Sequence, residues 1–335
     1  MARRSRVVSF GKITGRLFPV LFFLPLFLLC GNAFAAEKKI SVGYFPNVTH
    51  AHALVAQSMA ADGGGWFESR LPEGVSLEWH SFNAGPSAME ALFSKSIDLT
   101  YVGPSPVLNA FVRSKGGVTV AAGAVRGGAA LVVPEKSALS LPGDFRGMRI
   151  ATPQLGNTQD VACRSWLTEA GLRITMTGGD AKVIPTPNPT ILQLFATDGI
   201  DAAWTVEPWV SRLELELGGK VVYTEPVETS VTTVLAMGKT FSDANPALAL
   251  AFVAAHGELT EWIKANPDEA KRRVREELTR QMRREFPAEV LERAWPRLLF
   301  ENAIAAAEFA RSLEAAQDAG FLKGEHDLTG LVGGE

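Results

Sequence analysis

A short pattern occurs twice in this chain, about a hundred residues apart, and it restricts the possible folds more than any other feature. Each copy is typical of a helix end, a turn, an apolar strand and a proline-containing loop. Two such segments predict two similar α/β lobes, and ligands of open α/β sheets bind beyond the carboxyl ends of the strands. The copies are Leu92-Phe93, Ile97-Asp98 and Gly103-Pro104, and then Leu194-Phe195, Ile200-Asp201 and Glu207-Pro208.

The rest of the chain alternates between strand-like and helix-like segments up to about Asn245 and is then mainly helical. This alternation predicts an α/β protein with two mainly parallel sheets and flanking helices. We expect the crossing to the second lobe at Arg126-Gly127-Gly128 and the return crossing in the β-branched run Val231–Met237. The expected lobes are therefore residues 36–125 plus 234–335 and residues 126–233.

The first 35 residues have the three parts of a secretory signal peptide. Five Arg and Lys residues precede an apolar run, Leu17–Leu29, which is followed by the small-residue cleavage site Ala33-Phe34-Ala35. The run contains two prolines and is shorter than the roughly 20 residues that a membrane-spanning helix needs. We therefore expect cleavage after Ala35 and export to the periplasm.

Removal of this segment would take the formal charge from −3 to −8, because it contains five basic residues and no acidic residue. An acidic exported protein is a poor general binder of nucleic acid or anionic membranes. Cys163 would then be the only cysteine, so no internal disulfide is expected. It falls on an apolar helical stripe and is expected to be an inert core thiol.

Several predicted strand-to-helix turns are rich in glycine and in neutral hydrogen-bonding residues. A helix N-terminus presents unpaired N–H groups and a partial positive charge, so such turns can hold an anion without Lys or Arg. For any one turn, plain helix capping is the better explanation, so the anion site rests on the whole set. The turns are Asn47-Val48-Thr49, Gly85-Pro86-Ser87, Gly103-Pro104-Ser105 and Gly156-Asn157-Thr158-Gln159.

The sequence contains no nucleophile elbow, P-loop or dinucleotide fingerprint. His50 and His52 are too close in sequence to share a helix face and lack further metal ligands nearby. We therefore expect neither catalysis nor a cofactor nor a bound metal.

The segment Trp204 to Trp209 is the most unusual short stretch of the chain. Trp204 could form the wall that contacts the apolar part of a ligand. Glu207 could pair with a ligand ammonium or cap the backbone that follows it. Arg126, at the expected crossing, could contact the ligand or lie on the surface, and the sequence leaves both alternatives open.

Several of these motifs occur in an order that resembles the periplasmic substrate-binding proteins of ABC importers for nitrate, sulfonates and taurine. The resemblance covers nearly all of the chain after Ala35. Its motifs are Gly43-Tyr44-Phe45-Pro46-Asn47, Val102-Gly103-Pro104-Ser105-Pro106, Asp144–Arg149, Gly156-Asn157-Thr158-Gln159-Asp160, Ala202–Trp209 and Asn266–Ala270.

The resemblance implies a bilobed type II periplasmic-binding-protein fold with two crossings, a hinge-closing ligand cleft and no catalysis. It also implies a monomer that delivers a small anion or zwitterion to a membrane permease. Phe45 and Trp204 would wall the organic part of a sulfonate-like ligand. The implied ligand-binding residues are Phe45, Asn47, Thr49, His50, Gly85, Ser87, Gly103, Ser105, Gly156, Asn157, Thr158, Gln159, Trp204 and Glu207.

Other ligands and roles remain open at this point. A carboxylate of Glu207 that faces the cleft favours a zwitterion such as taurine or an amine-bearing pyrimidine, a thiamine precursor. If Glu207 only caps a helix, an alkanesulfonate or nitrate fits better. An enzyme resembling the pyrimidine synthases that share this fold, and a sensor that docks on a membrane receptor, are the alternative function classes.

Overall fold

The computed structural model describes residues 8–12, 15 and 38–333. The chain divides into two compact units, Met1–Ala35 and Ala36–Glu335. In the first unit, the described residues form neither helix nor strand. The predicted cleavage site and apolar run lie outside the described residues. Among the helices that the structure describes, none has both the length and the apolar character needed to cross a membrane.

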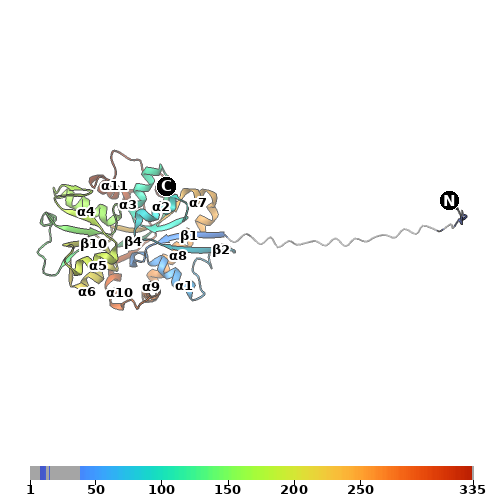
Figure 1. The fold of residues 1–335 in the computed structure, drawn as a ribbon, viewed down its shortest axis with the longest axis horizontal. Helices are drawn as coiled ribbons and strands as arrows, with labels where there is room; N and C mark the ends of the chain where they lie inside the picture. Colours follow the sequence, from blue (N-terminus) through green and yellow to red (C-terminus); the bar gives the residue numbers. More distant parts are fainter. Residues whose placement is uncertain (1–7, 13–14, 16–37, 334–335) are drawn as a thin grey trace, which may run out of the picture. The chain divides into compact units, whose positions relative to one another are not determined.

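The second unit contains two large sheets, and each is the centre of what we call a lobe (Figure 1). The first lobe is built on a six-stranded sheet with the order β13-β4-β12-β3-β1-β2. Its strands are β1 (Lys38–Tyr44), β2 (Val75–Ser81), β3 (Leu99–Val102), β4 (Val118–Gly127), β12 (Val231–Gly238) and β13 (Leu298–Phe300).

The second lobe is built on a five-stranded sheet with the order β11-β5-β10-β6-β9. A small hairpin of β7 (Ile174–Thr175) and β8 (Gly178–Gly179) lies outside this sheet. The five strands are β5 (Ala129–Pro134), β6 (Arg149–Thr152), β9 (Lys182–Pro185), β10 (Ala202–Val206) and β11 (Gly219–Thr224).

Both sheets are mixed, which differs from the expectation of mainly parallel sheets. In each lobe three strands run parallel, β2-β1-β3 in the first and β9-β6-β10 in the second. The strands on the other side of β3 and β10 pair antiparallel. The sheets are mixed because the chain crosses between the lobes twice. At these crossings β4, β5 and β12 connect the lobes directly, without the intervening helix that a parallel connection needs.

The two crossings are hydrogen-bonded to each other. The outgoing chain turns at Gly127 and Gly128, both with positive φ, where glycine avoids the strain of a side chain. The Gly127 N–H donates to the Ser230 carbonyl at 2.8 Å, and the Thr232 hydroxyl donates to the Gly127 carbonyl at 2.5 Å. The two chains of the hinge therefore form one unit.

The repeated pattern forms the same local structure in both lobes. Helix α2 (Gly85–Phe93) precedes β3, and helix α5 (Asn188–Ala196) precedes β10. Asp98 accepts a hydrogen bond from the Ser41 N–H at 2.9 Å, and Asp201 accepts one from the Arg149 N–H at 2.7 Å. In each copy an aspartate thus ties the start of its strand to the neighbouring parallel strand.

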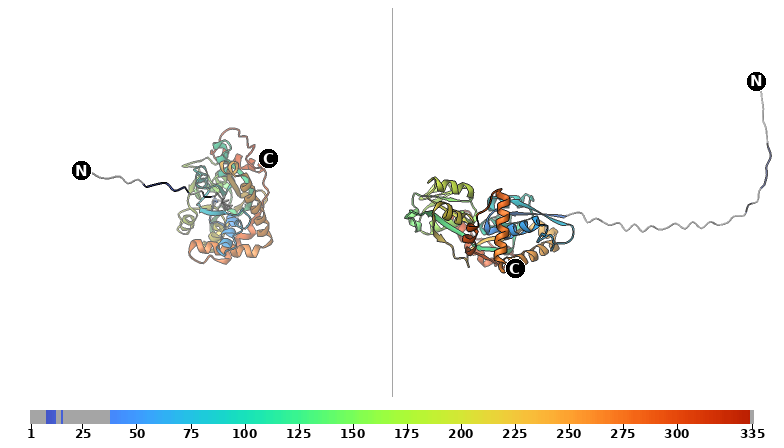
Figure 2. Two further views of the ribbon diagram at one scale, coloured as in Figure 1. Left: turned by 90° about the vertical axis from the view of Figure 1, so that its right-hand side faces the viewer. Right: turned by 90° about the horizontal axis from the view of Figure 1, so that it is seen from below.

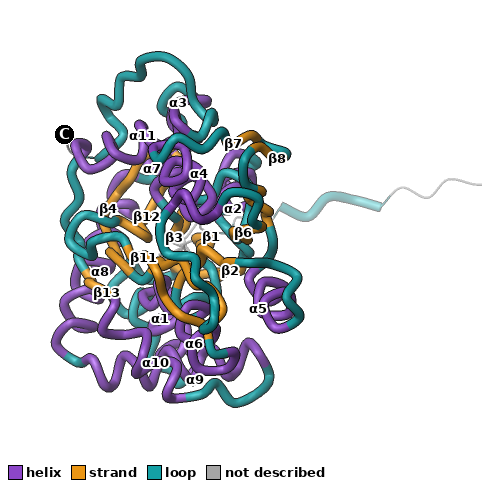
Figure 3. Tube along the Cα trace, turned by 90° about the vertical axis from the view of Figure 1, so that its left-hand side faces the viewer, coloured by secondary structure: helices purple, strands orange, loops and turns teal. Residues whose placement is uncertain are grey.

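Helices cover both faces of each sheet, as the expected flanking helices do (Figure 3). In the first lobe, one core lies against α1, α8 and α9, and the other lies against α2, α3 and α11. In the second lobe, α4 covers one face, while α5 and α6 cover the other. The remaining bounds are α1 (Ala51–Ala61), α3 (Pro104–Ser114), α4 (Thr158–Glu169), α6 (Trp209–Leu217), α7 (Lys239–Ala244), α8 (Pro246–Ala265), α9 (Pro267–Met282), α10 (Ala288–Ala294) and α11 (Phe309–Asp318).

The C-terminal helices pack against both lobes, beside elements far away in the sequence (Figure 2). Helix α9 lies against α1 of the first lobe, α10 against α6 of the second, and α11 against both α3 and α4. A 3-10 turn at Ala306–Glu308 leads into helix α11.

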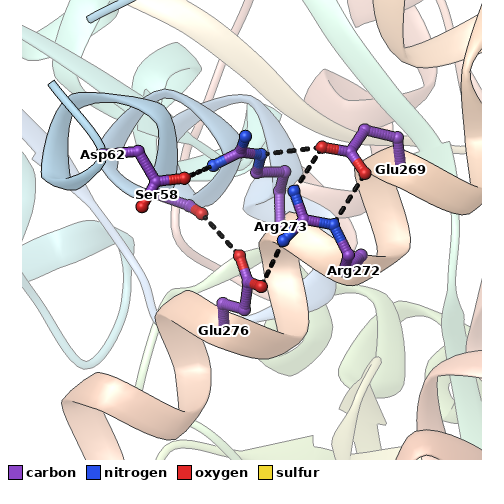
Figure 4. Close-up of polar contacts among 6 residues, drawn as sticks. All are labelled: Ser58, Asp62, Glu269, Arg272, Arg273 and Glu276. Atoms are coloured by element: carbon purple, nitrogen blue, oxygen red, sulfur yellow. Dashed lines mark hydrogen bonds and ion pairs between the residues drawn. The ribbon is translucent and has the colours of Figure 1, made fainter. Parts of the chain in front are cut away.

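Basic residues of α9 that could suggest a binding patch are matched by carboxylates (Figure 4). Arg272 contacts both Glu269 and Glu276, and Arg273 joins Glu269 to Asp62 at the end of α1. The Arg272 guanidinium lowers the pKa of Glu269 to about 2, so that carboxylate stays charged. This surface is a network of ion pairs that joins α9 to α1.

A chain of buried polar groups crosses the core of the first lobe beneath α1. His256 donates from Nε2 to the Gly123 carbonyl at 2.7 Å, so its Nδ1 accepts from the Tyr101 hydroxyl at 3.0 Å. Thr260 donates to the His256 carbonyl and therefore accepts from His52 Nε2 at 2.9 Å. The His52 and His256 rings lie 4.6 Å apart, and both are neutral in this arrangement.

Acid should unfold the protein through these histidines. Burial lowers the pKa of His256 to about 4 and that of His52 well below its usual value of 6.5. Below pH 6.5 the unfolded state binds protons that the folded state excludes, so stability is complete above that pH and is lost as the pH falls. Each such histidine costs about 2 kcal/mol at pH 5. Urea unfolding at pH 7.5 and pH 5 measures the loss.

The variant His256→Gln provides the comparison, because glutamine can keep a donor toward Gly123 but does not titrate. We expect its stability to fall about 2 kcal/mol less than that of the natural chain between the two pH values. An equal loss in both proteins would show that His256 does not cause the acid sensitivity.

Candidate functional site

A small cavity lies between the two lobes, at the carboxyl ends of their parallel strands. Its volume is about 20 Å³, room for about one water molecule. Both lobes contribute to it, and its lining comes mainly from the loops that begin helices. The lining residues are Phe45, Asn47, Thr49, His50, Asn83, Ala84, Gly85, Gly103, Pro106, Pro153, Asn157, Thr158, Gln159, Asn188, Val206 and Thr232.

Five helices have their N-terminal ends at this cavity. In the first lobe these are α2, α3 and α1 with the 3-10 turn Val48–His50 before it, and in the second they are α4 and α5. The close approach of two of them requires a glycine, because a Cβ on Gly85 would lie 2.3 Å from Pro106 Cγ. Since the first N–H groups of a helix lack intrahelical partners, the cavity is surrounded by backbone donors and positive helix ends.

In the first lobe, two cavity side chains have their acceptor atoms occupied by the protein. Asn47 Oδ1 accepts from Trp209 Nε1 at 2.8 Å, so its amide nitrogen is the atom left for a ligand. His50 Nδ1 accepts from the Phe45 N–H at 3.3 Å, which makes Nε2 the protonated ring nitrogen. The His50 ring packs against Phe45 with 4.3 Å between ring centroids. Both side chains therefore offer donors.

The second lobe repeats this arrangement. Asn188 Oδ1 accepts from the Thr205 hydroxyl at 2.6 Å, which leaves its amide nitrogen as the group without a described partner. Asn157 Oδ1 caps α4 by accepting from the Asp160 N–H, and its amide nitrogen donates to Gln159 Oε1 at 3.0 Å. Gln159 in turn keeps its own amide nitrogen as a donor. Four side chains from two lobes thus present N–H groups, because the protein uses their acceptors.

The cavity wall is uncharged at neutral pH. Every lining residue is apolar or neutral, and burial lowers the pKa of His50 to about 3, so its imidazole stays neutral. The nearest buried charges on α4 neutralise each other, since Asp160 and Arg164 pair at 3.0 Å. Asp160 also accepts from the Gly156 N–H at 2.9 Å and shapes the loop before α4. The cavity therefore combines hydrogen-bond donors with no formal charge.

Gly103 of the first lobe and Thr158 of the second lie close together at the cavity. A Cβ on Gly103 would lie 2.1 Å from Thr158 Oγ1. This hydroxyl is buried and has no hydrogen-bond partner among the described residues. At the other side of the cavity, Asn83 donates to the Pro153 carbonyl at 3.3 Å, and Gln154 donates to Ser87 Oγ at 3.1 Å. These contacts hold the lobes together around the cavity.

The structure brings nine of the fourteen implied ligand-binding residues to this one cavity. Ser87 instead pairs with Gln154 across the lobes, and Gly156 supports the loop before α4. Ser105 and Trp204 line a second, larger groove on the other side of Thr158. The nine are Phe45, Asn47, Thr49, His50, Gly85, Gly103, Asn157, Thr158 and Gln159.

Glu207 does not line the cavity. Its carboxylate is fully buried, caps α6 through the Ser211 N–H and hydroxyl, and pairs with Arg297 at 2.7 Å. Burial raises the pKa of Glu207, and Arg297 and the Ser211 donors oppose that shift. Arg126 also serves the hinge, since it pairs with Glu301 and Glu308. Of the alternatives left open by the sequence, the geometry selects the structural one for Glu207.

Sequence reasoning missed some lining residues, of which Asn83 and Asn188 are the most informative. Each lies between a strand and the proline of the next helix start: Asn83 is two residues before Gly85-Pro86, and Asn188 is the first residue of α5, directly before Pro189. An asparagine shortly before such a proline in both lobes was the available signal. Val206 and Thr232 carry no such signal, because they come from strands that reach the cavity only in the folded protein.

The described residues contain no cluster of three His, Cys, Asp or Glu side chains that could hold a metal ion. His50 lies at the cavity, whereas His52 is hydrogen-bonded in the core, so the two do not converge. Cys163 is buried on α4, and burial raises the pKa of its thiol.

Comparison with known proteins agrees with this architecture. The pattern of the NMT1-like family matches residues 34–278. The taurine-binding periplasmic protein of Escherichia coli is 27% identical over 251 residues, which cover 72% of each chain.

Two solved structures share the fold at lower identity. The alkanesulfonate-binding protein SsuA of Xanthomonas axonopodis pv. citri, bound to MOPS, superposes with a TM-score of 0.70 at 20% identity, covering 84% of this chain and 92% of that chain. The nitrate-binding protein NrtA of Synechocystis gives a TM-score of 0.66 at 15% identity, covering 86% and 83%. The chain therefore belongs to the NMT1-like family and has the fold of the periplasmic binding proteins.

Proposed function

We propose that this protein is the periplasmic receptor of an ABC importer and that it binds a small sulfonate-like organic anion between its lobes. The proposal rests on the hydrogen bonds around the cavity, where the protein itself occupies the acceptor atoms of three side chains. Asn47, His50 and Asn188 each give their acceptor atom to the protein and keep an N–H for the ligand. A sulfonate has three acceptor oxygens and no donor, so it matches such a wall.

Neutral donors suit an anion that must be released again. Preorganised N–H groups at helix ends stabilise a negative charge without the desolvation cost of a buried Lys or Arg. The overall charge of the chain is negative, so local donors must supply the attraction. Location in the periplasm is supported by the name of the taurine-binding periplasmic relative and by the predicted signal peptide, and delivery to a membrane permease is the role that the resemblance implies.

The geometry favours a sulfonate or nitrate over taurine or an amine-bearing pyrimidine inside this cavity. An ammonium or ring amine favours an acidic partner. Glu207, the carboxylate that the sequence suggested for this role, instead pairs with Arg297 and accepts a hydrogen bond from the Ser211 hydroxyl. Enzymatic activity of the pyrimidine-synthase type has no support from the cavity, where the described side chains include no carboxylate or thiol.

Binding requires the lobes to separate and close again. Ligand pockets usually have volumes of about 300–1,000 Å³, far above the present cavity of about 20 Å³. The chain crosses between the sheets at Gly127-Gly128 and again at residues 225–230, and these two segments can absorb such a hinge motion. A ligand then stabilises the closed form through contacts with both lobes.

Calorimetric titration of residues 36–335 with ethanesulfonate, nitrate, taurine and an aminopyrimidine tests the ligand class. We expect the alkanesulfonate to bind most tightly, with taurine weaker because no carboxylate among the lining residues can pair with its ammonium. Failure of every sulfonate to bind would rule out the proposed ligand class, and tightest binding of the aminopyrimidine would replace it.

The substitution Asn188→Asp tests the role of the donors. It keeps the acceptor for Thr205 but replaces the amide N–H with a carboxylate oxygen that repels an anion. We expect sulfonate affinity to fall by at least about 100-fold, together with some loss of thermal stability, because the new carboxylate is buried. Asn266→Asp, at an exposed helix start remote in sequence from the cavity, is the matched control. Unchanged affinity in Asn188→Asp would place the anion elsewhere.

The substitution Gly103→Ala tests closure. Its methyl group would collide with Thr158 Oγ1 only when the lobes are closed, so apparent sulfonate affinity should fall about tenfold or more. Gly143→Ala, where a Cβ has no neighbour within 4 Å, is the control. Adding Thr158→Ala should recover part of the loss, and a Gly103→Ala protein with natural affinity would contradict the closed arrangement.

A further inference from the structure

The indole of Trp209, the first residue of α6, reaches from the second lobe to a cavity residue of the first. Its Nε1 donates to Asn47 Oδ1 at 2.8 Å, a contact between residues 162 positions apart in the sequence. Trp209 itself does not line the cavity, whereas Asn47 does. Trp209 can therefore affect a ligand in the cavity only by positioning other residues.

The surroundings of Trp209 hold its indole in one orientation. The side chain is 8% exposed and packs against Ala129 and Val206. The guanidinium carbon of Arg212 lies 5.2 Å from the centre of the ring. The turn before α6 is fixed as well, because the buried carboxylate of Glu207 accepts from the backbone of that helix. Packing and capping thus fix the direction in which the indole N–H points.

Backbone hydrogen bonds hold Asn47 opposite this indole. The Val48 N–H donates to the Glu207 carbonyl at 3.1 Å, and the Glu207 N–H donates to the Gly128 carbonyl at 2.8 Å. The first bond ties the loop of Asn47 to the turn before α6, and the second ties that turn to the outgoing crossing of the hinge. The contact between Asn47 and Trp209 is therefore supported by the protein alone and needs no ligand.

The type of donor decides which atom of an asparagine is left for a ligand. An indole N–H can only donate, so Trp209 excludes the reversed Asn47 amide, in which two N–H groups would meet. The hydroxyl of Thr205, which donates to Asn188 Oδ1 at 2.6 Å, is able both to donate and to accept. Of these two cavity asparagines, Asn47 is therefore the one whose orientation is fixed by its partner.

We propose that Trp209 is a positioning residue that determines the specificity of the cavity. It keeps the Asn47 amide nitrogen as the atom left for the ligand, so this part of the wall binds an oxygen acceptor and rejects an N–H group. A site built for one hydrogen-bonding pattern rejects a ligand of the same shape with another pattern, because a buried polar group is then left unpaired. The inference rests on the proposed function and deepens it, since it names the residue that makes the wall selective.

Two probes of similar shape test this role by competition calorimetry. Ethanesulfonate presents three oxygens, whereas ethanesulfonamide is uncharged at pH 7 and carries an NH2 group in place of one oxygen. We expect the natural chain to prefer the sulfonate by at least about 100-fold. In Trp209→Phe the indole N–H is removed and Asn47 can reverse its amide, so the preference should fall at least about fivefold. A general loosening of lobe closure would weaken both probes alike and leave their ratio unchanged.

The variant Asn47→Ala supplies the matched background, because Trp209 then has no amide to orient. In that background Trp209→Phe should change the preference by less than about twofold. Trp262→Phe, at a partly buried tryptophan in the core of the first lobe, controls for the loss of ring volume and should keep the full preference. An unchanged preference in Trp209→Phe, or an equal fall in the Asn47→Ala background, would overturn the inference.

The indole proton of Trp209 reports the contact in the ligand-free chain. Its NMR resonance should move upfield in Asn47→Ala, because the acceptor is removed, while the Trp262 resonance stays in place. A Trp209 resonance that does not move would also overturn the inference. If ethanesulfonate binds but the preference does not depend on Trp209, the inference fails and the proposed function stands. If ethanesulfonate does not bind the natural chain, the proposed function fails and the selectivity assigned to Trp209 fails with it.

Discussion

The carboxyl ends of the parallel strands in both sheets face one space, and the rest of the structure depends on this constraint. Each of these strands is followed by a helix, and the N-terminal ends of five of those helices, with their unpaired N–H groups, line this space. The protein then uses the acceptor atoms of the nearby amides and of His50 for its own hydrogen bonds. Fold topology and side-chain hydrogen bonding thus act in the same direction, toward a neutral wall of donors.

The buried charged side chains near the cavity and at the hinge form ion pairs, and none of them lines the cavity. Asp160 and Arg164 neutralise each other within α4, and Glu207 and Arg297 join the second lobe to the segment before β13. Arg126 does the same at the hinge through Glu301 and Glu308. A buried charge without a partner is costly, so these pairs hold loops in place without placing a net charge at the cavity.

The repeated pattern shows how much of the fold can be predicted from the sequence. It predicted a helix end, a turn and a strand in each of two lobes, and both copies form that structure, with Asp98 and Asp201 in the same role. The same reasoning expected mainly parallel sheets and missed short elements such as β13, because three residues at a sheet edge carry too little periodicity. Strands that change direction at the crossings cannot be recognised locally, since their partners lie a hundred residues away.

The sequence by itself determined the α/β class, the two-lobed organisation and most of the loops that meet at the cavity. These depend on local signals, namely glycine and proline at helix starts and apolar runs before them. Only the tertiary structure decided that Glu207 pairs with Arg297, that Trp204 belongs to the neighbouring groove, and that the Asn47 and Asn188 amides present their nitrogens. Those outcomes depend on which atom of a distant residue takes each hydrogen bond, and sequence spacing does not carry that information.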